Sequence, residues 1–258
     1  MGGLYGLLPK SKIIIEDNTG WALWAADLFS RSARDCVNKQ GRFVVALSGG
    51  STPRPVHRLL GQEPYCSHIP WYGTHIFWVD ERCVRETNPA SNFGAAKADF
   101  LDYIPIPATQ IHPMPAEAFP EDGAKQYEQE LKNFFGSDER CLPIFDLIFL
   151  GIGQDGHTAS LFPGQRAVDE WEKWVVAVKG GNPNLSRLTM TFPVLNHAKQ
   201  IVFLVSGKGK ALVIKAIFEE SNPPLPAQGV QPVSGRLMWL LDQEASSLLS
   251  GERPNDEP

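Results

Sequence analysis

The sequence predicts an α/β fold with a doubly wound, mostly parallel sheet, helices on both faces and additional short strands. Short apolar runs alternate along the chain with longer amphipathic runs, which is the order that strand–helix units produce. The apolar runs are nearly continuous, as expected for parallel strands that are covered on both faces. Polar motifs directly follow four of these apolar runs, and the prediction of function rests on these motifs.

The elements follow in order along the chain. Six apolar runs are predicted as buried strands of this sheet: 12–16 (KIIIE), 42–47 (RFVVAL), 75–79 (HIFWV), 145–150 (FDLIFL), 174–178 (WVVAV) and 200–205 (QIVFLV). The segment 235–241 (GRLMWLL) is also strand-like, and the proline-rich 222–232 before it is predicted as a loop. Amphipathic patterns predict helices at 19–37, 123–135 and 210–220.

The length of 258 residues suits one large domain. We expect a single domain over residues 1–258, with a core from about 12 to 242 and a polar tail from about 250 to 258. The amino terminus has no convincing signal peptide and no run is apolar enough to cross a bilayer. We therefore expect a cytoplasmic protein, and a monomer.

Charge and cysteine content exclude several classes of function. A net charge of −5 argues against general binding to nucleic acid or a membrane surface. The four cysteines form no C-x-x-C pair and read as reduced thiols, and the histidines have no metal-binding spacing. We expect no metal and no cofactor. The cysteines are Cys36, Cys66, Cys83 and Cys141.

Four polar motifs each begin where a predicted strand ends. They are SGGSTP (48–53), DER (80–82), GIGQDGH (151–157) and SGKGK (206–210). In an open parallel sheet the carboxyl ends of the strands share one edge, and ligands bind there. We therefore expect the four motifs to converge on one crevice.

The segment GIGQDG at 151–156 matches the G-x-G-x-x-G fingerprint of dinucleotide-binding folds. Such a loop must run into a helix that faces the pyrophosphate, with an acidic residue about 20 positions later. Here Pro163 and Gly164 interrupt the segment, and the strand that follows ends in Lys179. The fingerprint fails these tests, and we predict no NAD site.

What remains is a glycine turn that presents Asp155 and His157. A carboxylate two residues from an imidazole can orient the ring and stabilise its protonated form, as a general base requires. The alternative is that Asp155 caps the turn and His157 packs as a satisfied polar residue. These two residues alone leave both interpretations open.

The segment SGGSTP reads as a strand-to-helix turn in which Ser51 or Thr52 could cap and Pro53 suits the first helical position. Free amides at such a turn favour a phosphate group, and the alternative is an ordinary capped helix without a ligand. Arg187 and Lys210 are either phosphate partners or solvated surface charges. For Asp80, Glu81 and Arg82 the alternative to a functional role is a local ion-pair cluster.

Together these segments resemble the 6-phosphogluconolactonase family. The match runs in order from about Lys12 to Asp242, and its most specific part is GIGQDGHTASLFP. The resemblance implies hydrolysis of 6-phospho-D-glucono-1,5-lactone to 6-phospho-D-gluconate, the second step of the oxidative pentose phosphate pathway. The segments are LSGGSTP, FWVDER, SNFG, FDLIFLGIGQDGHTASLFPG, RLTMTFPVLNHAK and LMWLLD.

The lactonases are similar in fold to the glucosamine-6-phosphate deaminases, whose corresponding segment resembles D-G-H-I-A-F-N-E-P. Its glutamate stands five residues after the histidine, where this chain has Phe162, and the deaminase D-E-Y is replaced by DER, with Arg82 at the tyrosine position. Both departures favour the lactonase. A sugar-phosphate deaminase or isomerase, a non-catalytic sugar-phosphate sensor and a promiscuous lactonase remain as alternatives.

The resemblance also implies a role for each candidate residue. His157 would deprotonate the attacking water and Asp155 would orient its imidazole. Arg82 would contact the ring hydroxyls or the developing oxyanion, and a part for Asp80 is left open. The substrate phosphate would bind the loop amides with help from two cations: Ser48, Gly49, Gly50, Ser51, Thr52, Arg187 and Lys210.

Overall fold

The computed structural model describes residues 11–17, 20–136, 141–219 and 224–249. Its strands are β1 (Ser11–Glu16), β2 (Phe43–Leu47), β3 (Thr74–Trp78), β4 (Asp80–Arg82), β5 (Ile111–His112), β6 (Leu147–Leu150), β7 (Val175–Gly180), β8 (Leu185–Met190), β9 (Gln200–Val205) and β10 (Arg236–Asp242). The helices are α1 (Gly20–Gln40), α2 (Arg54–Leu60), α3 (Tyr65–His68), α4 (Asn92–Asp99), α5 (Pro120–Phe135), α6 (Phe192–Leu195) and α7 (Ala211–Glu219). The tail expected from about 250 to 258 lies outside the described residues.

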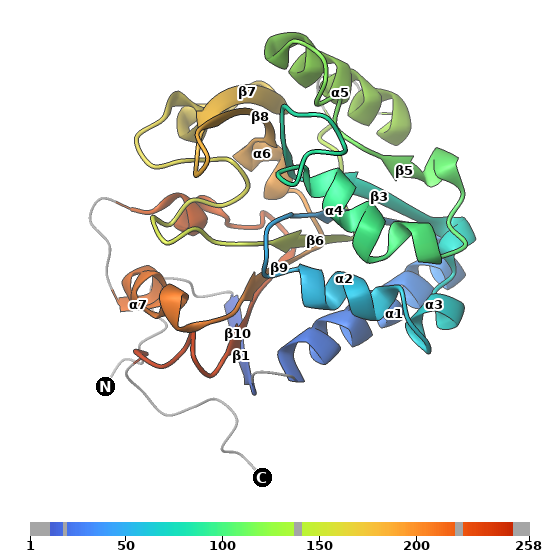
Figure 1. The fold of residues 1–258 in the computed structure, drawn as a ribbon, viewed down its shortest axis with the longest axis horizontal. Coiled ribbons are helices and arrows are strands. Elements are labelled where there is room, and N and C mark those ends of the chain that lie inside the picture. The colour runs from blue at the N-terminus through green and yellow to red at the C-terminus, as the bar shows by residue number, and fades with distance from the viewer. Residues whose placement is uncertain (1–10, 18–19, 137–140, 220–223, 250–258) are drawn as a thin grey trace.

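Seven strands form one parallel sheet in the order β1-β10-β9-β6-β2-β3-β5 (Figure 1). The register places the ends of neighbouring strands near one another. Leu47 and Trp78, the last residues of β2 and β3, are paired, and Leu150, the last residue of β6, is paired with Phe203, two residues before the end of β9. The loops after β2, β3, β6 and β9 therefore leave the sheet along the same edge. This arrangement confirms the predicted mostly parallel sheet.

The central strands are buried on both faces, as their continuous apolar sequences predict. Every residue of β2 and of β6 is buried, and so are five of the six residues of β9. Helix α1 packs against β1, β2 and β10 and also against α2, which in turn packs against α4. A strand with both faces covered needs apolar side chains at consecutive positions, which explains why these segments do not alternate.

The prediction for 174–178 as a strand of the parallel sheet is wrong. This segment begins β7, which pairs antiparallel with β8 in a separate three-stranded sheet of order β4-β8-β7. Only the first and last residues of β7 are buried, because one side packs against α5 and the strand forms the edge of its sheet. A run of small and branched apolar residues predicts a strand but does not reveal its partner.

The helices begin and end close to the predicted positions. Helix α5 starts at Pro120, three residues before the predicted start, with Glu121 and Asp122 in its first turn, and ends before Gly136, whose φ is 63°. Proline at the start, acidic residues near the amino end and a left-handed residue at the end are favourable at these places. Helix α7 spans Ala211–Glu219, within the predicted 210–220.

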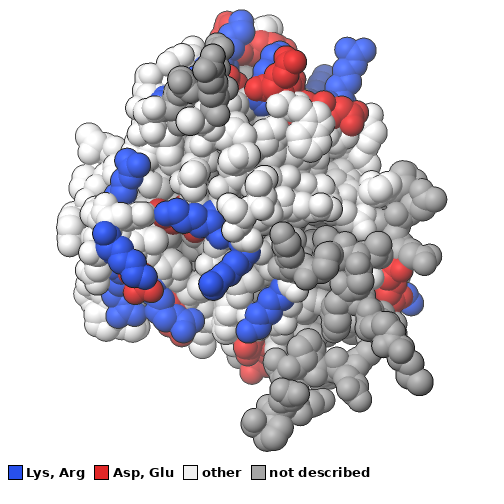
Figure 2. All heavy atoms as spheres, turned by 180° about the vertical axis from the view of Figure 1, so that it is seen from behind, with Lys and Arg blue, Asp and Glu red and all other residues white. Residues whose placement is uncertain are grey.

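The back of the molecule carries basic and acidic side chains mixed together, with a broad area of other residues across its middle (Figure 2). None of the helices in the described ranges is long and apolar enough to cross a membrane.

Candidate active site

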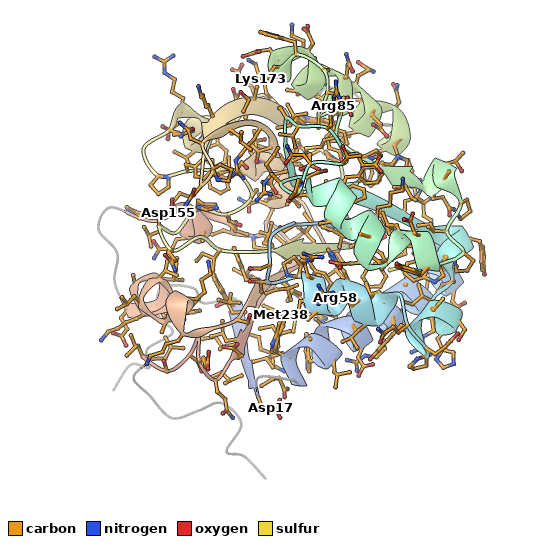
Figure 3. All side chains as sticks on the ribbon, in the orientation of Figure 1. Asp17, Arg58, Arg85, Asp155, Lys173 and Met238 are labelled. Carbon is orange, nitrogen blue, oxygen red and sulfur yellow. The ribbon has the colours of Figure 1, made fainter. Side chains whose placement is uncertain are left out.

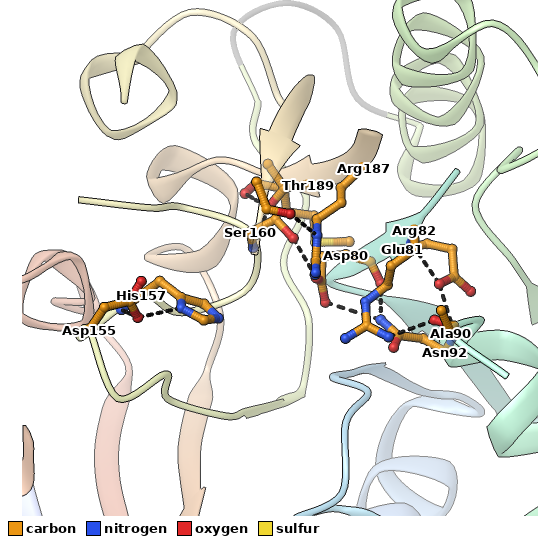
Figure 4. A network of polar contacts seen from close by, with 12 residues as sticks. Asp80, Glu81, Arg82, Ala90, Asn92, Asp155, His157, Ser160, Arg187 and Thr189 are labelled. Carbon is orange, nitrogen blue, oxygen red and sulfur yellow. Dashed lines mark hydrogen bonds and ion pairs between the residues drawn. The ribbon is translucent and has the colours of Figure 1, made fainter. Parts of the chain in front are cut away.

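All four polar motifs line one pocket at the carboxyl edge of the parallel sheet, as expected from their positions after strands. The pocket has a volume of about 180 Å³. Figure 4 shows the Asp155–His157 pair on one side of the site and Asp80, Arg82 and Arg187 on the other. The pocket is lined by Ser48, Gly49, Gly50, Ser51, Thr52, Asp80, Arg82, Asn92, Gly151, Ile152, Gly153, His157, Ala159, Arg187 and Lys210.

His157 and Asp155 form a pair within the glycine turn. The His157 Nδ1 atom lies 2.5 Å from Asp155 Oδ1, and the same oxygen accepts the backbone N–H of His157 at 3.2 Å. The pair fits only because residue 153 is glycine: a Cβ atom there would overlap both the imidazole and the carboxylate. The glycine turn therefore makes room for a histidine–carboxylate pair.

Phe162 lies between His157 and Arg187. Its ring centroid is 4.7 Å from that of His157, and the Arg187 guanidinium carbon is 5.6 Å from it. Phe162 is buried. Position 162, where the deaminase segment has a glutamate, therefore carries an apolar ring in contact with the imidazole of His157.

The loop Ser48–Thr52 is attached to the sheet at its first residue. Ser48 donates its backbone N–H and its hydroxyl to the carbonyl of Phe149. The expected capping by Ser51 or Thr52 is wrong: Pro53 is the N-cap residue of α2 and no side chain caps it. Gly49 packs directly under the side chain of Asn92, which fills the space of a Cβ atom at 49.

Arg187 is a buried cation, so its interpretation as a solvated surface charge is wrong. Its side chain is only 4% exposed, Nε donates to the carbonyl of Gly180 at 3.0 Å, and Nη1 lies 3.9 Å from Asp80 Oδ2. Burial, followed by the nearby Arg82 cation, lowers the pKa of Arg187. The site therefore holds a desolvated guanidinium with a defined orientation.

Asp80 is also buried in this pocket. Its Oδ2 atom accepts a hydrogen bond from the Ser160 hydroxyl at 2.6 Å, and its Oδ1 atom lies 3.4 Å from the side-chain nitrogen Nδ2 of Asn92. Asn92 further donates to the Asp80 carbonyl at 2.9 Å. Asp80 therefore belongs to a hydrogen-bonded network at the pocket wall.

Glu81 and Arg82 have different surroundings. The buried Glu81 carboxylate accepts the N–H groups of Asn92 and Phe93 at the start of α4, and burial raises its pKa. Arg82 lines the pocket, and its Nη1 donates to the carbonyl of Ala90 at 2.6 Å. Glu81 thus anchors helix α4, whereas Arg82 presents its guanidinium to the pocket.

Lys210 reaches the pocket from the segment after β9. Its Nζ donates to the carbonyl of Ile152 at 2.6 Å, and burial lowers its pKa below the ordinary value of 10.5. The ammonium group therefore lies beside the glycine turn that holds His157. Its neighbour Lys208 is exposed and is not among the residues that line the pocket.

A larger hollow lies elsewhere, between α5 and β7, with a volume of about 680 Å³. It includes Lys173, which Figure 3 shows far from Asp155. Its walls carry exposed charges, and none of the four polar motifs reaches it. Among the described residues, no group of three or more histidine, cysteine, aspartate or glutamate side chains could hold a metal ion.

Asn92, Ser160 and Ala159 belong to the site although no role was predicted for them from the sequence. Asn92 belongs to the SNFG segment and Ser160 to the HTASLFP segment, so both lie within the motifs that carry the resemblance. A single polar residue in such a segment carries no local signal of its partner. Only the tertiary structure brings these residues to Asp80 and the pocket.

Comparison with known proteins identifies the family of the chain. The sequence model of the family described as glucosamine-6-phosphate isomerases/6-phosphogluconolactonase matches residues 16–239. The chain belongs to this family.

Relatives in this family cover most of the chain. A 6-phosphogluconolactonase of Synechocystis is 43% identical over 217 residues, which are 83% of this chain and 87% of that protein. A 6-phosphogluconolactonase of Rattus norvegicus is 38% identical over 232 residues, covering 87% of this chain and 88% of its own. The crystal structure of a 6-phosphogluconolactonase from Thermotoga maritima, 27% identical, covers 90% of this chain and all of its own with a TM-score of 0.78.

Proposed function

We propose that this protein hydrolyses 6-phospho-D-glucono-1,5-lactone to 6-phospho-D-gluconate, the second step of the oxidative pentose phosphate pathway. The observation that carries the proposal is the His157–Asp155 pair at a pocket that also holds three cationic side chains. A base and an anion site in one pocket suit a phosphorylated ester substrate. The names of the relatives support the same reaction.

In this proposal His157 acts as the general base through Nε2. An ionised carboxylate only accepts hydrogen bonds, so Nδ1–H donates to Asp155 and Nε2 is free to take a proton. Nε2 removes a proton from water as the water oxygen attacks C1 of the lactone. The C1–O5 bond then breaks and the imidazolium returns a proton to O5. Asp155 stabilises the imidazolium during these steps.

The substrate phosphate is assigned to the amides of Ser48–Thr52, with Arg187 and Lys210 supplying positive charge. Charge-assisted hydrogen bonds from such groups are about twice as strong as neutral ones. Arg187 is buried and Lys210 is half-buried, so water screens their charges less than those of surface cations. Arg82 is assigned to the oxygen at C1, where negative charge develops in the transition state.

Phe162 favours lactone hydrolysis over sugar-phosphate deamination. The deaminase segment has a carboxylate at this position, and in this chain the position holds a buried phenyl ring packed on His157. The ring can neither donate nor accept a proton. Lactone hydrolysis requires no additional acid at this place.

A coupled assay tests the proposal. Glucose 6-phosphate, its dehydrogenase and NADP generate the lactone in place, and its decay is followed with and without the protein. We expect lactone decay well above the spontaneous rate with the wild type. The variant His157→Gln should lose this acceleration, since glutamine replaces the base with an amide of similar size.

Three results would contradict the proposal. Lactone decay at the spontaneous rate with folded protein would reject the activity. Ammonia release from glucosamine 6-phosphate would then indicate a deaminase. Binding of 6-phosphogluconate without turnover of either substrate would indicate a sugar-phosphate sensor.

A further inference from the structure

The charges around the pocket are unequal. Three cationic side chains line it, Arg82, Arg187 and Lys210, and among the described lining residues Asp80 is the sole acidic one. The cationic side chains that line the pocket therefore outnumber the acidic ones. A phosphate ester carries about −1.5 to −2 at neutral pH. The excess of cationic side chains in the lining therefore suits an anionic phosphate group.

Asp80 is held rigidly in this position. The Ser160 hydroxyl donates to Oδ2 at 2.6 Å, and the backbone N–H of Ser160 is in turn held by Thr189 Oγ1 at 3.1 Å. Thr189 is the strand partner of Asp80 in the β4–β8 ladder. Figure 4 shows these side chains and Arg187 gathered at one wall of the site. A carboxylate fixed in this way cannot turn away from a bound anion.

Arg187 and Asp80 form an ion pair that has no direct hydrogen bond. Their nearest atoms are 3.9 Å apart, which is beyond hydrogen-bond distance, whereas Arg187 Nε is engaged by the Gly180 carbonyl. Both side chains are at most 7% exposed, so water screens their charges little. Asp80 lines the pocket itself and Arg187 offsets its charge only in part, so the remaining field of Asp80 acts on a ligand there.

Lactone hydrolysis changes the charge of the ligand. The lactone has an uncharged ester at C1. Addition of water forms a C1–O bond, breaks C1–O5 and yields a carboxyl group, which is ionised at neutral pH after its proton passes to solvent. In the transition state the oxyanion is balanced by the imidazolium, so the extra negative charge is present only in the product.

We propose that Asp80 is the residue that makes the pocket discriminate against the hydrolysis product. Its fixed negative charge repels the new carboxylate, which accelerates product release and limits product inhibition. This inference rests on the proposed function, because it uses the charge difference between lactone and acid. It gives Asp80 a role in selectivity without proton transfer.

A pair of stable ligands isolates this effect. The product 6-phosphogluconate and D-glucitol 6-phosphate have the same chain and phosphate, and differ at C1 by a carboxylate against a CH₂OH group. Asp80 repels the phosphate of both equally if they bind alike. The ratio of their dissociation constants therefore reports the interaction with the carboxylate alone.

The test is titration calorimetry of both ligands with wild type and Asp80→Asn. In the variant the affinity for 6-phosphogluconate should rise relative to that for D-glucitol 6-phosphate by about threefold to fiftyfold. Coulomb's law gives this range for two unit charges about 7 Å apart as the effective dielectric constant falls from about 80 to about 20. An unchanged ratio would overturn the proposal.

Ser160→Ala is the matched control for geometry. It removes the 2.6 Å hydrogen bond to Asp80 but leaves the charge in place. The ratio of the two affinities should stay near that of the wild type. A shift as large as that of Asp80→Asn would mean that the network, and not the charge, sets the selectivity.

If Asp80→Asn fails to fold, a second pair of variants tests the premise of the proposal, that a carboxylate in the pocket wall weakens binding of the product carboxylate. Ala159 lines the pocket and has φ of 50°, a left-handed conformation that aspartate and asparagine adopt more readily than other residues. Ala159→Asp should bind 6-phosphogluconate more weakly, relative to D-glucitol 6-phosphate, than Ala159→Asn does. Equal ratios in these two variants would overturn the proposal.

The lactone assay separates this inference from the proposed function. If wild type does not accelerate lactone decay, the proposed function fails and the inference falls with it. If wild type accelerates the decay and the affinity ratio is the same in wild type and Asp80→Asn, only the inference fails.

Discussion

The imidazole of His157 occupies the space in which a side chain at Gly153 would lie. Gly153 also donates its backbone N–H to the carbonyl of His157 at 2.8 Å, so the turn closes on itself around the imidazole. Gly153 is one of the glycines that make residues 151–156 resemble a dinucleotide-binding loop. In this protein glycine is required at 153 because the His157 side chain lies so close to it.

Replacement of Gly153 by alanine should therefore disrupt the His157–Asp155 pair. The new Cβ would force the imidazole or the carboxylate to move, and misplacement of about 1 Å can cost about 10²-fold in rate. We expect a fall of that order in kcat for lactone hydrolysis. Gly209→Ala is the control, since residue 209 does not line the pocket and a Cβ there meets only the end of the Gln154 side chain. Equal losses in both variants would contradict this explanation.

The role of His157 predicts a separation of turnover from binding. His157→Gln should lower kcat by about 10²- to 10⁴-fold, the usual contribution of one general base. Affinity for D-glucitol 6-phosphate, measured by calorimetry, should change little because the phosphate contacts remain. A variant with wild-type turnover would remove His157 as the base.

Lys210 is expected to act on the phosphate group. Lys210→Ala should weaken binding of the phosphorylated lactone, seen as a higher KM, more than binding of unphosphorylated gluconolactone. Lys208→Ala is the matched control, because Lys208 is exposed and lies two residues away without lining the pocket. Equal effects of Lys210→Ala on both lactones would contradict a phosphate role.

His57 makes stability depend on pH. It is buried in α2 against Phe100, and burial lowers its pKa to about 4. Between pH 6.5 and 4 the unfolded chain binds a proton that the folded chain does not, so stability is lost as the pH falls through this range. The loss amounts to about 3 kcal/mol in the free energy of unfolding.

Urea unfolding at several pH values measures this effect. In His57→Leu the decline of stability between pH 6.5 and 4 should be smaller than in the wild type. Some decline should remain, because burial lowers the pKa of His75 to about 4 as well. A variant with the same pH dependence as the wild type would show that His57 does not titrate in this way.

Local pattern predicted the parallel sheet because buried strands require continuous apolar runs, as in β2 and β6. The same reasoning placed 174–178 in the wrong sheet. Pairing depends on which strand lies alongside, and the partner β8 was hidden by its polar residues Ser186, Arg187 and Thr189. The last four residues of β8 are buried, but two of them, Arg187 and Thr189, are polar, so the strand has no continuous apolar run.

The sequence by itself determined the parallel sheet and the polar motifs at its carboxyl edge, because both depend on residues close together in the chain. It left open whether Asp155 pairs with His157, and the structure shows that pair. Only the tertiary structure decided that Arg187 is buried rather than solvated, and that Asp80 contacts Ser160 and Asn92. The contact between Asp80 and Ser160 joins residues that are 80 positions apart in the chain. Burial and long-range electrostatics arise from packing, and neither can be read from neighbouring residues.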